Sequence, residues 1–278
     1  MHLSMTTDYM ADTGCPEPYL RRIAEAGFTH VHWCHQWNTD FLYAPCEVDQ
    51  IARWLREFRL QLLDLHGSHG REKAWGSLVE YERQAGVALV LNRIEMTAQL
   101  GGDAVVMHFP RSRPDLPRER AWAGLLKSLD EIAPVARRLG VRLAIENGGH
   151  DDFEDHRALF ALYGPDVLGL CYDSGHGNIG GRGLDHLDTV KDRLFAVHLH
   201  DNNGEGDRHD LPFSGTIDWN RLARITAHSA YRKCVSTEAN MRRSGRKDER
   251  RWLHRAHRSC ASLARMIDAH GNTVDDSE

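Results

Sequence analysis

The 278-residue sequence lacks several features that would assign it to other protein classes. No apolar run approaches the roughly 18 residues that a membrane-spanning helix needs. The N-terminal MHLSMTTDYM has no basic segment followed by a long apolar stretch, so we expect neither a membrane span nor a signal peptide. No linker or low-complexity segment divides the chain ahead of its polar end. We therefore expect one continuous domain.

Cysteine is scarce, and its spacing excludes the common two-cysteine motifs. The six cysteines include no CxxC pair. Cys34, Cys171 and Cys234 lie in apolar runs, where a thiol behaves as a small apolar side chain. This pattern favours a reduced, cytoplasmic setting over a disulfide-stabilised secreted protein.

The sequence also lacks a large excess of either positive or negative charge. The chain carries 35 Lys and Arg against 40 Asp and Glu, which gives a formal net charge of −5. That balance argues against a nucleic-acid coat or a membrane-surface protein. The apolar content of 41% is enough for the core of one large domain.

What the sequence does contain is an alternation of short apolar runs with longer amphipathic segments. The expected strands are 2–5, 29–34, 60–65, 103–108, 141–146, 167–173, 194–200 and 233–238. The expected helices are 16–27, 47–58, 89–102, 119–140, 155–163, 184–191, 218–228 and 248–269. Eight strand–helix units predict an α/β fold, a single (β/α)₈ TIM barrel over residues 1–270, followed by a polar C-terminal tail, 271–278.

Residues that bind metals or transfer protons stand where these strands end. In such a barrel the active site forms at the carboxyl ends of the strands. Six consecutive strands end in His66, His108, Glu146, Asp173, His198 and Glu238. Six such residues at one rim indicate a shared site.

Each residue taken alone also has a purely structural interpretation. A single histidine at a strand end is more often a solvated or hydrogen-bonded residue than a ligand. Asp173, followed by Ser174, fits a helix N-cap, and Asp201 fits a turn. His200, two residues after His198, is predicted to be structural and to point away from the site.

Two glutamates make a purely structural interpretation less satisfactory. Glu146 and Glu238 end runs that should be nearly dry, where an unpaired carboxylate is costly. A cation would offset that cost, and mixed oxygen and nitrogen ligands suit Mn²⁺, Zn²⁺, Co²⁺ or Mg²⁺. We therefore predict a metal site with His198 as a ligand, covered by the loop that follows it.

The motifs at these strand ends resemble a known family. HGSHG, MHFP, AIEN, YDSGH, HLHDNNG–DRH and STE are similar to the xylose isomerase-like barrel superfamily, over about residues 2–265. That superfamily includes sugar and sugar-phosphate isomerases and epimerases, and the apurinic-site endonuclease of DNA repair. The series AIEN, YDSGH, HLHD and the last glutamate is specific for the superfamily but not for any substrate.

The resemblance to the isomerase branch implies one divalent ion, held by Glu146, Asp173, His198 and Glu238, and no organic cofactor. It implies an isomerase or epimerase of a sugar, sugar phosphate or related polyol ketone, acting through a metal-stabilised enediolate. Glu146 and Glu238 would then be the catalytic pair that removes a proton and returns it.

The expected substrate is a small carbohydrate, and the mouth of the barrel offers residues to bind it. Trp33, with Trp37 and Phe109, is expected to supply apolar walls, and Arg111 and Arg208 to bind hydroxyls or a phosphate. Asp207 and His209 are expected to position the covering loop. The full expected substrate-binding set is Trp33, His66, His108, His176, Asp207, Arg208 and His209.

Alternatives stay open at this point. The endonuclease branch implies three zinc ions on His66 or His69, His108, Glu146, Asp173, His176, His198, Asp207, His209 and Glu238. A lyase or dehydratase on the same barrel is a further alternative. The overall acidity and the single clearly basic mouth loop, 111–120, argue against nucleic acid as a partner. Many barrels of this type pair, but no residue here indicates or excludes a homo-oligomer.

Overall fold

Eight parallel strands form the centre of the molecule. The computed structural model describes residues 1–68, 70, 72–110, 117–148 and 153–272, so His69, Arg111 and residues 273–278 lie outside the described part. The strands are β1 (His2–Thr6), β2 (His30–Trp33), β3 (Gln61–His66), β4 (Ala104–His108), β5 (Arg142–Glu146), β6 (Leu168–Asp173), β7 (Leu194–His198) and β8 (Cys234–Thr237). Each predicted strand is present within one or two residues of its expected position.

The sheet runs in the order β7-β6-β5-β4-β3-β2-β1-β8 and closes on itself. The closing contact lies just beyond β7, where the Leu199 N–H donates to the Ser236 carbonyl (3.0 Å) and the Glu238 N–H donates to the Leu199 carbonyl (3.2 Å). The predicted (β/α)₈ TIM barrel is confirmed.

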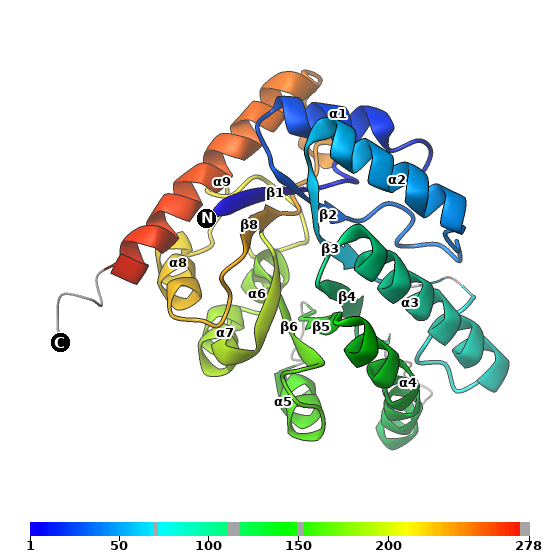
Figure 1. The fold of residues 1–278 in the computed structure, drawn as a ribbon. Coiled ribbons are helices and arrows are strands. Elements are labelled where there is room, and N and C mark those ends of the chain that lie inside the picture. The colour runs from blue at the N-terminus through cyan, green and yellow to red at the C-terminus, as the bar shows by residue number, and fades with distance from the viewer. Residues whose placement is uncertain (69, 71, 111–116, 149–152, 273–278) are drawn as a thin grey trace.

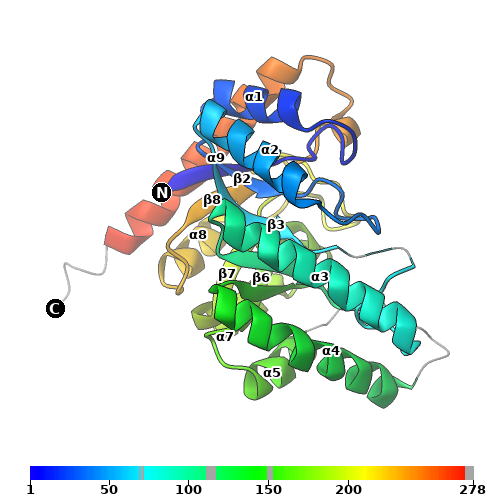
Figure 2. The same cartoon turned by 45° about the vertical axis from the view of Figure 1, so that its right-hand side comes forward.

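Helices surround the strands on the outside (Figure 1). They are α1 (Glu17–Glu25), α2 (Pro45–Phe58), α3 (Glu80–Leu100), α4 (Arg118–Leu139), α5 (Phe153–Leu162), α6 (Ser174–Ile179), α7 (Gly183–Val190), α8 (Trp219–Ala227) and α9 (Glu249–Asn272). Figure 2 shows α2, α3 and α4 side by side along one flank. Among the described residues, no helix combines the length and the apolar character needed to cross a bilayer.

The pleat of β5 decides which side chains reach the barrel interior. Leu143 belongs to a core cluster with side chains of α3, α4 and α5, so it points outward to the helices. Its neighbour Ala144 belongs to a cluster made only of strand residues. Because strand side chains alternate, Glu146 points inward like Ala144. His108 of β4 is its register partner and lies beside it at the same rim.

Two helices differ from the prediction. Helix α3 begins at Glu80 rather than at residue 89, because its first turns bury an arginine instead of an apolar stripe. The Arg83 guanidinium donates to Glu80, Glu131 and the Ser128 hydroxyl while only 2% exposed. Helix α6 was not predicted, since the segment SGHGNI contains two glycines and no apolar periodicity.

Candidate functional site

Three buried side chains from different strands meet at the carboxyl end of the barrel. His198, at the end of β7, lies between Glu146 of β5 and Glu238 after β8. Its Nδ1 is 3.3 Å from Glu146 Oε2 and 3.4 Å from Glu238 Oε2. All three are at most 9% exposed. The predicted contact between two carboxylates and an imidazole therefore exists.

Asp173, at the end of β6, has a double role. Its Oδ1 accepts from the His176 N–H (2.7 Å) and so caps α6, as the sequence suggested. Its Oδ2 lies 3.0 Å from His200 Nε2 and 3.8 Å from His176 Nδ1. His176 Nδ1 is in turn 3.4 Å from Glu146 Oε1, so Asp173 lies beside Glu146 across this imidazole.

The loop after β7 folds back over the cluster. An antiparallel pair of backbone hydrogen bonds joins Asp201 to Asp210 (2.8 and 3.0 Å) and closes the loop on itself. His209 Nε2 is 3.0 Å from Asp207 Oδ2, and its Nδ1 is 2.8 Å from the Glu238 carbonyl oxygen. Asp207 Oδ2 reaches to 3.9 Å from His176 Nε2. Both loop residues are thus held at the rim.

Two further histidines and a tryptophan complete the wall on the side of β3 and β4. His66 Nε2 and His108 Nε2 lie 3.7 and 3.6 Å from Glu146 Oε2. The Trp37 ring stands 4.6 Å from the His66 ring and 5.9 Å from the His108 ring. This wall combines an apolar face with imidazole nitrogens.

The structure does not bring two of the expected substrate-binding residues to this cluster. Trp33 is fully buried in the core, where its Nε1 donates to the Tyr43 hydroxyl (3.0 Å). The Arg208 side chain is half exposed and pairs with Asp210 (2.8 Å). Trp37 provides the aromatic surface that was expected from Trp33.

Sequence reasoning missed three members of the site. His200 was expected to point away, which was wrong, because residues two apart in an extended chain point to the same side. His200 follows His198 by two residues, and its Nε2 reaches Asp173. His32 of β2 lies with its Nε2 3.8 Å from Glu238 Oε1. Asp64 of β3 holds the other ring nitrogen of His32 at 2.7 Å. A carboxylate inside the apolar run LQLLDL was the available signal for Asp64.

Burial and neighbouring charges separate the two glutamates. Burial raises the pKa of Glu238 to about 8. Burial acts in the same direction on Glu146, but the imidazoles of His108 and His198 outweigh it and hold the pKa of Glu146 well below its usual range. Two nearby carboxyl groups with clearly different pKa values are typical of acid–base catalysis.

The surrounding imidazoles also differ from one another. Burial lowers the pKa of His66 and of His108. Burial acts the same way on His176, but the Asp173 and Glu146 carboxylates outweigh it and raise the pKa of His176 to about 11. The pKa values of the imidazoles are thus lower on the β3–β4 side than beside Asp173.

The donor set fits a divalent cation. Glu146 Oε2 and both ring nitrogens of His198 are buried and have no hydrogen-bond partner among the described residues. Several triads, among them His66–His108–Glu146 and His32–His198–Glu238, have all their candidate ligand atoms within 4.8 Å of one another. Buried polar atoms without partners are costly, and a cation coordinated by them removes that cost. Carboxylate and imidazole ligands suit Zn²⁺, Mn²⁺ or Co²⁺.

Residues 20–256 match the model of the family described as xylose isomerase-like TIM barrel. The chain belongs to this family. A relative, the uncharacterised protein y4fM of Sinorhizobium fredii, is 31% identical to this chain over 275 residues, and the match covers 89% of this chain and 88% of the relative.

Solved structures with the family's fold include sugar epimerases. A D-psicose 3-epimerase, determined in the presence of D-fructose, superposes with a TM-score of 0.78 at 18% identity and covers 98% of this chain and 100% of its own. The IOLI protein with a bound zinc atom superposes with a TM-score of 0.75 at 16% identity, covering 97% and 99%. At these identities the likeness establishes the fold alone.

Proposed function

We propose that this protein is a divalent-metal-dependent isomerase or epimerase of a sugar, sugar phosphate or related polyol ketone. One observation carries the proposal: two buried carboxyl groups, Glu146 and Glu238, face the same space from β5 and from beyond β8, with His198 between them. Inversion of a carbon beside a carbonyl by proton transfer needs two such groups on opposite sides of that carbon, one to remove the proton and one to return it.

The residues that would hold the ion are Glu146, Asp173, His198 and Glu238. When bound, a divalent cation supplies Lewis-acid stabilisation of the negative charge that develops on the substrate's oxygens. His200 fixes Asp173 Oδ2 at 3.0 Å and so keeps that carboxylate turned to the site. Residues that orient ligands in this way sharpen metal binding.

The chain's own groups would carry the proton. Glu146 and Glu238 would act as the pair of which one removes a proton from the carbon next to the carbonyl and the other returns one from the other face. The reverse reaction exchanges the two roles.

Substrate hydroxyls would meet the imidazoles of His66, His108 and His176, with Trp37 against the sugar carbons. Asp207 and His209 hold the covering loop over the site. The fold shared with a D-psicose 3-epimerase and with a zinc-bound protein supports both the substrate class and the use of a metal.

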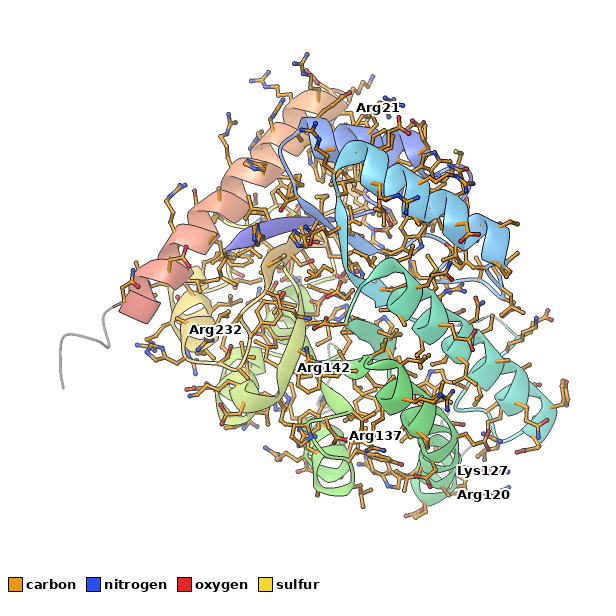
Figure 3. The ribbon with its side chains drawn as sticks, viewed as in Figure 1. Arg21, Arg120, Lys127, Arg137, Arg142 and Arg232 are labelled. Atoms are coloured by element: carbon orange, nitrogen blue, oxygen red, sulfur yellow. The ribbon has the colours of Figure 1, made fainter. Side chains whose placement is uncertain are left out.

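A second candidate is a trinuclear zinc phosphodiesterase of the apurinic-endonuclease kind. It is favoured by the His66–His108–Glu146 triad and by the contacts of His176 with Asp207. Of the basic residues labelled in Figure 3, Arg120, Lys127 and Arg137 lie on α4, and the others lie on α1, on β5 and just before β8. Four of them, Arg21, Lys127, Arg137 and Arg142, form ion pairs with acidic neighbours. Such pairing leaves them poorly placed to track a DNA backbone, so we rank this function second.

The test is a substrate panel in deuterated water. Free and phosphorylated ketoses, aldoses and inosose-like cyclic ketones are incubated with the protein and Mn²⁺, Co²⁺ or Mg²⁺. We expect deuterium at the carbon beside the carbonyl of at least one substrate, and loss of this exchange with a chelator. No exchange with any cation, together with cleavage of abasic DNA and three tightly held zinc ions, would transfer the assignment to the second candidate.

A further inference from the structure

The carboxylate of Glu238 faces two different sets of metal-binding atoms. Its Oε2 lies 3.4 Å from His198 Nδ1 and 3.9 Å from His209 Nδ1, on the side of the proposed catalytic ion. Its Oε1 lies 3.8 Å from His32 Nε2 and 3.9 Å from Cys34 Sγ. The second set comes from β2 and from the residue after it, and the proposed reaction does not use it.

His32 has the environment of a metal ligand. Its side chain is 1% exposed, and its Nδ1 lies 2.7 Å from Oδ1 of the fully buried Asp64. Because a carboxylate only accepts, this contact places the ring proton on Nδ1 and leaves the Nε2 lone pair facing Glu238. Nε2 has no hydrogen-bond partner among the described residues. Metal-binding histidines typically show this carboxylate–imidazole–metal order.

Cys34 adds a sulfur donor to the same place. It is 2% exposed, forms no disulfide, and points to the same side of the chain as His32, two residues earlier. The candidate ligand atoms of Cys34, His66 and Glu238 all lie within 4.8 Å of one another. His66 makes a 3.0 Å contact with the Gly67 carbonyl through Nδ1, which leaves its Nε2 lone pair free to face the group.

A purely structural role explains this arrangement less well. A core thiol that donates weakly to Glu238 would account for Cys34. It would leave Oδ2 of the buried Asp64 and the bare Nε2 of His32 without a hydrogen-bond partner among the described residues, next to a second carboxylate. A cation between His32, Cys34 and Glu238 accounts for all of these groups at once.

We propose that His32, Cys34 and Glu238 bind a second divalent ion, with Glu238 bridging it to the catalytic one. Three protein ligands with a fourth position toward His66 match the open coordination of reactive zinc sites. One thiolate and one imidazole select a borderline-soft cation, Zn²⁺ or Co²⁺, over Mg²⁺. The inference goes beyond the proposed function and shares with it Glu238 and, at the open position, His66.

Cobalt provides a direct test, because a thiolate bound to Co²⁺ gives a charge-transfer absorption that oxygen and nitrogen ligands do not. The metal-stripped full-length chain is titrated with Co²⁺, and bound metal is counted by elemental analysis. We expect two ions per chain and the thiolate band. Cys34→Ser and His32→Gln should each lose one ion and the band, whereas Asp173→Asn should lose the other ion and keep the band.

Two further variants separate binding from folding. Asp64→Asn should weaken the band-forming site by about 10–100-fold, as loss of an orienting partner does elsewhere. His30→Gln, on the same strand but outside both ligand sets, should leave both ions in place. All variants are checked for native circular dichroism, and the nearly isosteric Cys34→Ser serves where another variant does not fold.

The inference is overturned by a single bound ion without a thiolate band in the wild type, or by a folded Cys34→Ser that still binds two ions. Its failure is distinguishable from failure of the proposed function. Two ions and the band without sugar exchange would leave the second site standing and remove the sugar assignment. Sugar exchange with one ion would do the reverse.

Discussion

At the scale of single residues, the chemistry depends on the contrast between Glu146 and Glu238. Both are buried, yet Glu146 stands among imidazoles that keep it ionised, whereas burial raises the pKa of Glu238 to about 8. Oε2 of each group also lies within 3.4 Å of the same nitrogen, His198 Nδ1. The proposed proton transfer requires both carboxyl groups at this one place.

Replacing either glutamate by glutamine should therefore stop proton transfer without unfolding the barrel. We expect Glu146→Gln and Glu238→Gln each to reduce deuterium exchange into substrate by about 10²–10⁴-fold, the usual contribution of a general acid or base. Exchange is measured by NMR. The same change at the exposed Glu205 of the covering loop is the control and should have no effect. Wild-type exchange rates in both site variants would exclude this pair.

A glycine beside His200 gives a second prediction at this scale. A Cβ at Gly175 would lie 2.0 Å from His200 Cε1. The ring has no free space, because it is fully buried and stacks on His209 at 4.0 Å. Gly175→Ala should cost about 1–3 kcal/mol of stability by overpacking and weaken metal binding by about 10–100-fold through Asp173.

Denaturant unfolding and metal titration measure these two effects of Gly175→Ala. Gly206→Ala, whose Cβ would meet nothing within 4 Å, is the matched control and should change neither quantity. If Gly175→Ala binds metal with wild-type affinity, the orienting role of His200 is wrong.

How far the sequence could predict the site is clearest from individual residues. Glu146, His198 and Glu238 could be found because each ends an apolar run, and the position of a strand end follows from a local pattern. His200 could have been found in the same way, because residues two apart in an extended chain point to the same side as each other. Trp33 and Trp37 look alike in sequence, and only packing decides which of them faces the site.

At the scale of elements, the strands were predictable and two of the helices were not. A buried parallel strand is a short apolar run, so its position is visible. The start of α3 is hidden, because Arg83 satisfies its charge through Glu80 and Glu131, partners that no local pattern indicates. Helix α6 is hidden by Gly175 and Gly177, which are required by close packing rather than by helical propensity.

The contact between α6 and α7 provides the prediction at this scale. A Cβ at Gly183 would lie 2.3 Å from the Gly177 Cα. Because the clash is with backbone, it can be relieved only if the backbone of α6 or α7 moves. Gly183→Ala should destabilise the fold by about 1–3 kcal/mol, measured by denaturant unfolding. Gly271→Ala, near the end of α9 with nothing within 4 Å, is the control and should not destabilise. Equal stability of the two variants would contradict the close packing.

At the scale of the whole molecule, acid stability should depend on one histidine outside the site. His186 of α7 is 3% exposed, stacks on Phe153 at 3.9 Å, and neither of its ring nitrogens has a hydrogen-bond partner in the described part of the chain. Burial lowers its pKa from 6.5 to about 3. Between pH 6.5 and about pH 3, His186 therefore binds a proton in the unfolded chain but not in the folded chain.

The free energy of unfolding should therefore decrease as the pH falls. Stability from this residue is complete above pH 6.5 and is lost as pH falls from there toward 3. Between pH 7 and pH 5 the loss should be about 2 kcal/mol, at about 1.4 kcal/mol per pKa unit. His186→Phe, which keeps a stacked ring without the proton site, should lose about 2 kcal/mol less than the wild type over this interval. Identical pH slopes would refute the assignment.

The proposed catalytic centre requires side chains that are far apart in the sequence to bind one cation together at the carboxyl end of the barrel. Anomalous diffraction from a crystal grown with Mn²⁺ tests this most directly. We predict a peak coordinated jointly by Glu146, Asp173, His198 and Glu238. An anomalous map with no peak among these four side chains, at saturating Mn²⁺, would contradict the proposed catalytic centre.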